Sequence, residues 1–215
     1  MPVTAVVFDL DYTLAVPERD RQTLLDETAK AVGVPRVSRE SYLDAHRRNL
    51  TSETREPIFA ELLDDEASAN AAAETYRNAI GDALVPIEGA ESMITDLERT
   101  YRVGLLTDGP VCAQQAKLDA LGWNDLFDSV VITGSLVAGK PDERAFRAII
   151  EALSADADET VYVGDRPEID VAGARDAGLR AIHVIDNGET APEADATVER
   201  DALAVDLPGL LDALG

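Results

Sequence analysis

The stretch that decides the fold lies near the start of the chain and reads Val3-Thr4-Ala5-Val6-Val7-Phe8-Asp9-Leu10-Asp11-Tyr12-Thr13-Leu14. The run from Val3 to Leu10 is mostly apolar and rich in β-branched residues, which predicts a strand buried on both faces of a parallel sheet. It ends in two acidic residues, Asp9 and Asp11, which we expect at the carboxyl end of that strand. In open parallel sheets, ligands bind in the crevice at this end.

Beyond Pro86, strand-like and helix-like segments alternate. We predict helices over 89–99, 110–121, 142–153, 169–177 and 202–214, and strands over 103–107, 129–133, 160–163 and 181–185. This alternation predicts βα units and a doubly wound α/β fold, in which a Rossmann-like parallel sheet carries helices on both faces. Residues 1–14 and 87–215 are therefore expected to form one core domain.

The segment between these two parts, residues 15–86, has a different character. From about Val16 to Asp82 it is rich in Ala, Glu, Arg and Leu, with almost no strand-like run. Apolar residues recur at helical spacing, and we predict four helices and no sheet. An insertion of this length at the carboxyl end of the first strand would lie over the ligand crevice. We therefore expect an all-α cap domain.

The chain is strongly acidic. Its 215 residues include 42 Asp and Glu against 19 Lys and Arg, which gives a net charge of −23, and only three residues are lysines: Lys30, Lys117 and Lys140. Such a charge repels nucleic acids and anionic membranes, so we expect neither as a partner. Strong acidity with scarce lysine and few aromatic residues favours a halophilic protein, built for salt so concentrated that the Debye length falls to ~3 Å.

Two features bear on the cellular location. Residues 1–4 lack the basic region of a signal peptide, and no apolar run approaches the ~20 residues that cross a bilayer. The single cysteine, Cys112, cannot form an internal disulfide. Both features favour a cytoplasmic protein. The sequence carries no signal for an oligomeric state.

Four polar clusters follow predicted strands or open predicted helices. They are Asp9-x-Asp11-x-Thr13, Thr107-Asp108-Gly109, Gly139-Lys140-Pro141 and Gly164-Asp165-x-x-x-x-Asp170. Because the carboxyl ends of parallel strands share one edge of the sheet, these clusters can meet there. Converging carboxylates repel one another unless a cation intervenes, and their hard oxygen atoms suit Mg²⁺. A metal, a lysine, a hydroxyl and free backbone N–H groups make a phosphate site, where a carboxylate can attack phosphorus.

With these four motifs in this order, the sequence resembles the haloacid dehalogenase superfamily of hydrolases, in the subgroup with a helical cap after the first motif. The resemblance covers residues 1–14 and about 87–190. It implies a Mg²⁺-dependent phosphohydrolase that cleaves a small phosphorylated metabolite through an aspartyl-phosphate intermediate.

The resemblance also implies roles for single residues. Asp9 would be the nucleophile and a Mg²⁺ ligand. Asp11 would be the general acid/base, with its backbone carbonyl on Mg²⁺. Thr107 would hydrogen-bond the phosphoryl oxygens, and Lys140 would neutralise the nucleophile and the phosphate.

The remaining motif residues would complete the metal and phosphate sites. Asp165 would be the main further Mg²⁺ ligand, and Asp170 a ligand through water or an orienting partner. The backbone near Asp108 and Gly109 would help to bind the phosphate, together with Thr13.

Three residues depart from the family pattern or lie outside it. Tyr12 stands where glycine is most common, next to the cap hinge, and we expect it to line the substrate crevice. Asp108 stands where asparagine is common, and its charge predicts a side chain that points away from the phosphate or caps the next helix. Arg47 lies in a basic cluster of the cap with Arg48, Asn49 and Arg55, which either forms ion pairs along a helix or contacts an anionic substrate.

Other activities stay open on the sequence alone. A phosphomutase keeps the same motifs. A dehalogenase would not need Asp11, and a phosphonatase-like enzyme needs a lysine in the cap, where only Lys30 lies. A non-catalytic, phosphate-binding regulatory protein would keep the fold without turnover. The intact set of catalytic residues argues against it: Asp9, Asp11, Lys140 and Asp165.

Overall fold

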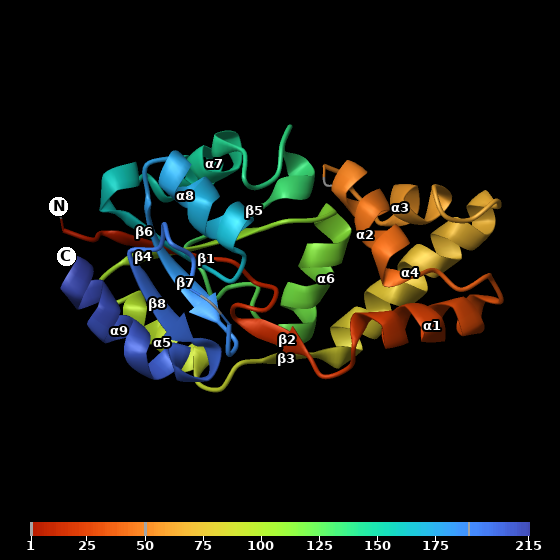
Figure 1. Cartoon of the computed structure of the whole chain (residues 1–215), viewed down its shortest axis with the longest axis horizontal. Coiled ribbons are helices and arrows are strands. Elements are labelled where there is room, and N and C mark those ends of the chain that lie inside the picture. Colours follow the sequence, from red (N-terminus) through yellow and green to blue (C-terminus); the bar gives the residue numbers. More distant parts are fainter. Residues whose placement is uncertain (1, 50, 189) are drawn as a thin grey trace.

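The structure, a computed structural model, describes residues 2–49, 51–188 and 190–215 and is built around one parallel sheet of six strands (Figure 1). From edge to edge the strands are β5 (Ser129–Ile132), β4 (Arg102–Thr107), β1 (Ala5–Phe8), β6 (Thr160–Gly164), β7 (Arg180–Ile185) and β8 (Ala196–Glu199). Every neighbouring pair runs parallel. The first strand of the chain therefore lies inside the sheet, between β4 and β6.

Helices cover both faces of the sheet, as the sequence predicts. Alternate residues of β1 explain how: Val6 and Phe8 belong to the apolar core on the side of α5 (Ala90–Leu97) and α9 (Leu203–Leu214). The residues between them pack on the other face against α7 (Glu143–Leu153) and α8 (Ala172–Asp176). All four residues of β1 are fully buried, which accounts for its continuous apolar run.

The predicted elements after Pro86 are present, with ends that differ by a few residues. The helix predicted over 110–121 is α6 (Val111–Leu121). The helix predicted over 169–177 is preceded by a π-helical turn, Pro167–Val171. The last strand, β8, was not predicted, because its sequence Ala-Thr-Val-Glu is half polar and lies at the edge of the sheet.

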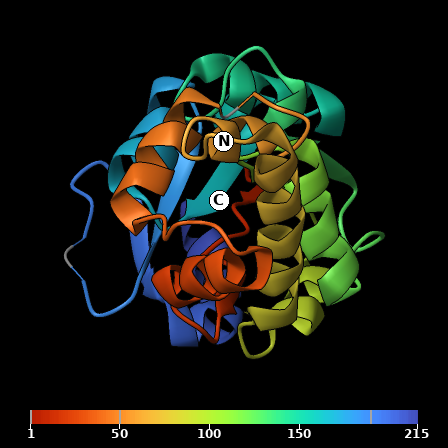
Figure 2. The same cartoon turned by 90° about the vertical axis from the view of Figure 1, so that its right-hand side faces the viewer.

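Four helices follow the first strand and form a separate layer, here called the helical unit: α1 (Arg21–Val32), α2 (Arg39–Arg48), α3 (Glu56–Ala60) and α4 (Glu66–Ala83). Side chains of Asp20, Ser38 and Asp65 accept hydrogen bonds from the first free N–H groups of α1, α2 and α4. The unit has its own apolar core, separate from those on the two faces of the sheet. In Figure 1 it lies at the right, on the side away from both chain ends, and Figure 2 views the molecule from that side.

The segments that join the helical unit to the sheet pair with each other. They form two short antiparallel strands, β2 (Ala15–Pro17) and β3 (Leu84–Pro86). This small sheet differs from the all-α segment that the sequence predicts, because three-residue strands carry too little periodic pattern to be detected.

Backbone hydrogen bonds hold the helical unit against the start of α6. The N–H groups of Val111 and Cys112 donate to the carbonyls of Ser52 (3.0 Å) and Glu53 (2.9 Å), which lie between α2 and α3. These donors would otherwise be free at a helix start. Within the described ranges, the helices are too short or too polar to span a membrane.

Candidate active site

The order of the strands brings three of the four motifs together. Asp9 follows β1, Thr107 ends β4 and Asp165 follows β6, and these three strands are neighbours. A cavity of about 210 Å³ lies between their carboxyl ends and the helical unit. The predicted residues that line it are Asp9, Asp11, Tyr12, Thr107, Asp108 and Asp165.

Lys140 lies behind this cavity and binds the carboxylate of Asp9. Its ammonium is fully buried and lies 2.8 Å from Asp9 Oδ1, 2.6 Å from Asp170 Oδ1 and 2.7 Å from the hydroxyl of Tyr162. Burial alone would lower the pKa of Lys140, but Asp170 and Asp9 raise it above its ordinary value, so the ammonium stays charged. The three N–H donors of Lys140 are thus used within the protein.

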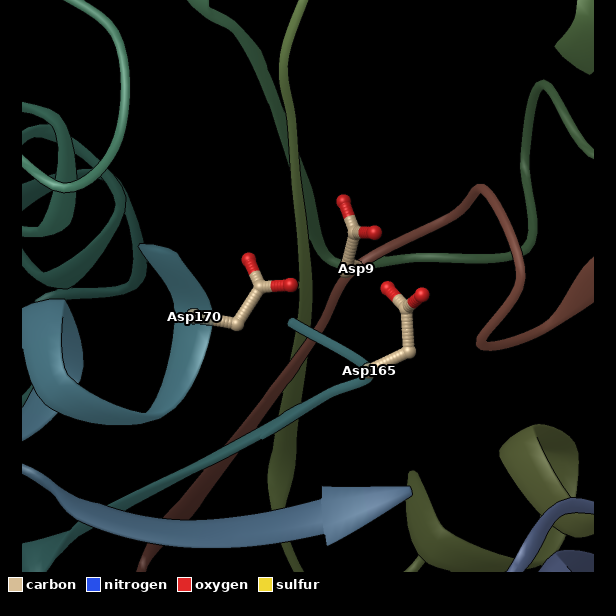
Figure 3. A group of neighbouring side chains, drawn as sticks. All are labelled: Asp9, Asp165 and Asp170. Atoms are coloured by element: carbon tan, nitrogen blue, oxygen red, sulfur yellow. The ribbon is translucent and has the colours of Figure 1, made fainter. Parts of the chain in front are cut away.

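The carboxylates of Asp9, Asp165 and Asp170 form a close cluster (Figure 3). One oxygen from each lies within 4.8 Å of the others. Burial, followed by repulsion from the other two, raises the pKa of Asp165 to about 8. Burial also raises the pKa of Asp9 to about 6, although Lys140 acts in the opposite direction. Crowded oxygen ligands whose negative charges repel one another are a fitting site for a hard divalent cation.

The three members of this cluster differ in how their oxygens are bound. Both oxygens of Asp170 are taken, Oδ1 by Lys140 and Oδ2 by the backbone N–H (3.0 Å) and Nε (3.2 Å) of Arg166. These two cations hold the pKa of Asp170 well below its usual range despite its burial. By contrast, Asp165 Oδ1 is buried with no hydrogen-bond partner in the described structure. A buried, unpartnered carboxylate oxygen fits a cation ligand, whereas Asp170 fits an orienting role.

His183 fixes the backbone at Asp165. Its Nδ1 accepts a hydrogen bond from the N–H of Ala191 (3.0 Å), so its Nε2 donates to the carbonyl of Asp165 (3.0 Å). The ring is buried in β7, as expected for a histidine whose two nitrogens are both satisfied.

The hydroxyl of Thr107 is free to bind a ligand. It is buried, lines the cavity and makes no hydrogen bond with the part of the chain that the structure describes. The hydroxyl of Thr13 is also buried and unpartnered there, but Thr13 does not line the cavity. The N–H of Gly109 donates to the hydroxyl of Thr133 (3.2 Å) and is therefore not available to a phosphate.

The expectation that Asp108 caps the next helix is wrong, because α6 begins without a side-chain cap. Asp108 lines the cavity, and its Oδ1 accepts the backbone N–H of Lys140 (3.0 Å). Its Oδ2 lies 3.1 Å from Arg166 Nη2. The guanidinium of Arg166 thus offsets the negative charge of Asp108 at the edge of the site.

Two cations that the sequence analysis missed hold Asp11. Arg21, at the start of α1, lies 2.9 Å from Asp11 Oδ1, and Lys117 of α6 donates to Oδ2. Both cations are buried. Burial alone would raise the pKa of Asp11, but Lys117 and Arg21 hold it well below its usual range. Lysine is so scarce in this chain that Lys117, on the helix after the second motif, could have been singled out as Lys140 was.

The helical unit contributes a basic and aromatic wall to the cavity, made of Arg39, Tyr42, His46, Arg55 and Tyr76. The basic residue proposed from the sequence, Arg47, does not line the cavity. Its exposed side chain lies 2.5 Å from Asp44, three residues earlier on α2. Of the two interpretations of that basic cluster, ion pairing along a helix describes Arg47.

Tyr12 lines the cavity as predicted and adopts a conformation that suits glycine. Its φ is 62°, in the left-handed region that costs a non-glycine residue about 1–2 kcal/mol. Arg200 stabilises this turn, since its Nε donates to the carbonyl of Tyr12 (2.6 Å). The structure thus explains why glycine is most common here in the family that the sequence resembles.

Comparison with known proteins identifies the family. The model of the haloacid dehalogenase-like hydrolases matches residues 3–178. A phosphoserine phosphatase from Thermus thermophilus is 35% identical over 60% of this chain and 54% of its own length. A pyrimidine 5′-nucleotidase from Escherichia coli is 32% identical over 49% of this chain and 48% of its own length. The chain thus matches about half the length of these relatives. A phosphatase from Thermococcus onnurineus has a similar solved structure, with a TM-score of 0.72, 26% identity, and 97% of this chain and 98% of that chain covered. Since the family model matches most of the sequence, the chain belongs to the haloacid dehalogenase-like hydrolases.

Proposed function

We propose that this protein is a Mg²⁺-dependent phosphohydrolase that cleaves a small phosphorylated metabolite through an aspartyl-phosphate intermediate. One observation carries the proposal. The Asp9 carboxylate, bound by Lys140, lines the same small cavity as Thr107 and Asp165. Among the described residues, neither the Thr107 hydroxyl nor Asp165 Oδ1 has a hydrogen-bond partner. The three groups supply a nucleophile, a hydrogen-bond donor for a phosphoryl oxygen and a cation ligand.

Asp9 and Asp165 would hold Mg²⁺, with the backbone carbonyl of Asp11 as the third ligand that the resemblance implies. When bound, Mg²⁺ would offset the repulsion between the carboxylates and the phosphate and polarise the phosphoryl oxygens. Asp170 would act on the cluster indirectly, because Lys140 and Arg166 occupy both its oxygens.

The residues of the chain would divide the reaction into two displacements. In the first, an oxygen of Asp9 attacks phosphorus, and the bond from phosphorus to the leaving oxygen breaks as Asp11 gives that oxygen a proton. In the second, a water molecule attacks the same phosphorus, gives its proton to Asp11, and releases Asp9 and inorganic phosphate. Arg21 and Lys117 favour the ionised form of Asp11. The second displacement uses this form as its base, whereas the first displacement requires the protonated form, which these two cations disfavour.

Residues 15–86 would act as a cap over this chemistry. The helical unit closes one side of the cavity and places Arg21 on the carboxylate of Asp11. A cap in this position excludes bulk water, which strengthens the electrostatic contacts inside. The relatives act on phosphoserine or pyrimidine nucleotides, which is consistent with a small phosphorylated substrate.

We further propose that the protein works in concentrated salt in the cytoplasm. A net charge of −23 on 215 residues repels itself strongly in dilute buffer, and salt screens that repulsion. The single thiol, Cys112, fits a reducing compartment.

The proposal is tested by hydrolysis of para-nitrophenyl phosphate and a panel of phosphorylated metabolites, in KCl of about 1 M or higher to screen self-repulsion. We expect release of inorganic phosphate that EDTA abolishes and Mg²⁺ restores. Asp9→Asn should be inactive, while Asp96→Asn, on the exposed side of α5, should match the wild type. Phosphoryl transfer to a second hydroxyl of a sugar would instead identify a phosphomutase. Absence of both reactions would contradict the proposal.

A further inference from the structure

The cavity carries an unusual concentration of positive charge. Five of the chain's 19 Lys and Arg residues line it, namely Arg21, Arg39, Arg55, Lys117 and Arg166. Arg21 and Lys117 both contact Asp11, and Arg166 contacts two further carboxylates. Within the described residues, Arg39 and Arg55 form no ion pair, in a chain where acidic residues outnumber basic ones by more than two to one. Both belong to the wall that the helical unit contributes.

Arg55 is the more informative of these two cations. It is only 6% exposed, its Nη1 donates to the hydroxyl of Tyr42 (2.6 Å), and its guanidinium carbon lies 5.5 Å from the ring centre of Tyr76. Its Nε is buried without a partner, and neither Nε nor Nη2 donates to any described residue. Tyr42 and Tyr76 therefore position the guanidinium but do not neutralise it.

A buried charge without a counter-charge is unfavourable unless a ligand supplies one. The free Nε–Nη2 edge of Arg55 is the edge through which a guanidinium binds a carboxylate with two parallel hydrogen bonds. The acids of the site do not fill this role. Asp11 is close enough for Arg55 to contribute to its lowered pKa, but its two oxygens are already bound by Arg21 and Lys117.

Neighbouring side chains keep this wall positive. The guanidinium of Arg39 lies 5.6 Å from the ring centre of Tyr42 and makes no ion pair with a described residue. His46 stacks on the same ring, with the ring centres 6.0 Å apart. Burial, and then Arg55, Lys117 and Arg39, lower the pKa of His46 to about 3. The imidazole is therefore neutral, and the positive charge of this wall comes from Arg39 and Arg55.

We propose that Arg55, assisted by Arg39, binds a carboxylate of the substrate, so that the substrate is a short phosphorylated carboxylic acid. The inference rests on the proposed function, since it places the phosphoryl group at Asp9 and the carboxylate against the opposite wall. The cavity of about 210 Å³ is smaller than the ~300–1,000 Å³ of sites for drug-sized ligands, which favours a chain of a few carbons over a nucleotide.

A matched pair of substrates tests this inference. 3-Phosphoglycerate and glycerol 3-phosphate have the same carbon skeleton and differ in a carboxylate against a hydroxymethyl group. A charge-assisted pair of hydrogen bonds predicts that the wild type prefers 3-phosphoglycerate by about 10- to 100-fold in kcat/KM. A three-carbon bisphosphate in the same assay distinguishes a second phosphate from a carboxylate as the recognised anion.

Substitutions then test which residue causes the preference for 3-phosphoglycerate. Arg55→Gln should lower the ratio of kcat/KM for 3-phosphoglycerate to kcat/KM for glycerol 3-phosphate towards one, because only the first substrate offers Arg55 a carboxylate. Arg39→Gln should do the same to a smaller extent. Arg48→Gln is the matched control, because Arg48 is exposed and bound to Glu61. Thermal unfolding checks that each variant is folded, and the Arg39 variant and the wild-type ratio decide the question if Arg55→Gln does not fold.

The outcomes separate the two levels of the account. Equal kcat/KM for the matched pair in the wild type, a preference for the bisphosphate, or an equal loss on all esters in Arg55→Gln would overturn the carboxylate site while leaving the phosphohydrolase intact. Failure to hydrolyse any ester, para-nitrophenyl phosphate included, would overturn the proposed function and this inference with it.

Discussion

The ammonium of Lys140 lies 2.8 Å from the carboxylate of Asp9, a residue 131 positions earlier in the chain. This contact joins the first and third motifs within the fully buried base of the site. Because the other donors of Lys140 bind Asp170 and Tyr162, Lys140 would act on a phosphate through its charge rather than through a free N–H group.

Loss of that charge should slow the reaction with little effect on substrate affinity. Lys140→Ala leaves two buried carboxylates, Asp9 and Asp170, without their shared cation, and we expect kcat to fall by about 10²–10³-fold. Lys140→Arg should restore little of the lost kcat, because a planar guanidinium cannot place three N–H donors around a single nitrogen as the ammonium does. Steady-state kinetics, with circular dichroism to verify folding, measures both. Wild-type kcat in Lys140→Ala would show that Arg166 supplies the necessary charge.

Asp165 should make the metal-free protein sensitive to pH. Its pKa is raised from 3.8 to about 8, so the folded state binds this proton more tightly than the unfolded state. Folding stability in EDTA should therefore fall as the pH rises from about 4 to 8. Asp165→Asn removes this contribution, and its unfolding temperature should exceed that of the wild type at pH 8.5 and approach it at pH 4.

Magnesium should reverse the difference. At pH 8, Mg²⁺ should raise the unfolding temperature of the wild type, because a ligand that binds only the folded state stabilises it. It should not raise that of Asp165→Asn. Thermal scans in EDTA and in Mg²⁺ provide both comparisons. Equal responses of the two proteins to Mg²⁺ would exclude Asp165 as a ligand.

Salt should stabilise the whole chain. The net charge of −23 repels itself over a Debye length of about 10 Å at 0.1 M salt and about 3 Å at 1 M. We therefore expect the unfolding temperature to rise with KCl across this range, and activity with it. An unfolding temperature that is independent of KCl would refute adaptation to concentrated salt.

The parts of the fold that were predicted are those in which local pattern and burial agree. The run Ala5–Phe8 reads as a buried strand because both its faces are covered, and the βα alternation after Pro86 determines the parallel sheet. The missed strands have no such pattern. The edge strand Ala196–Glu199 is half polar, and Ala15–Pro17 has only three residues and pairs with a segment about 70 positions away.

In the site, motif spacing predicted the groups that follow strands but not those that arrive by packing between units. Arg21 and Lys117 reach Asp11 from two different helices. Arg47 and Arg55 belong to one basic cluster in the sequence, yet only Arg55 lines the cavity. Arg47 lies on α2 and Arg55 directly precedes α3, so which of them faces the cavity depends on how these two helices pack, and no local pattern specifies that.

The most direct test of the central claim is detection of a phosphoryl group on Asp9. Asp11→Asn would remove the proposed base for the attacking water, so hydrolysis of the intermediate should become slower than its formation from acetyl phosphate. Rapid-quench mass spectrometry of this variant should show an added ~80 Da, the transferred phosphoryl group, on the peptide that contains Asp9. Asp9→Asn should never show it. The claim is contradicted if Asp11→Asn acquires no adduct while it hydrolyses phosphomonoesters at the wild-type rate.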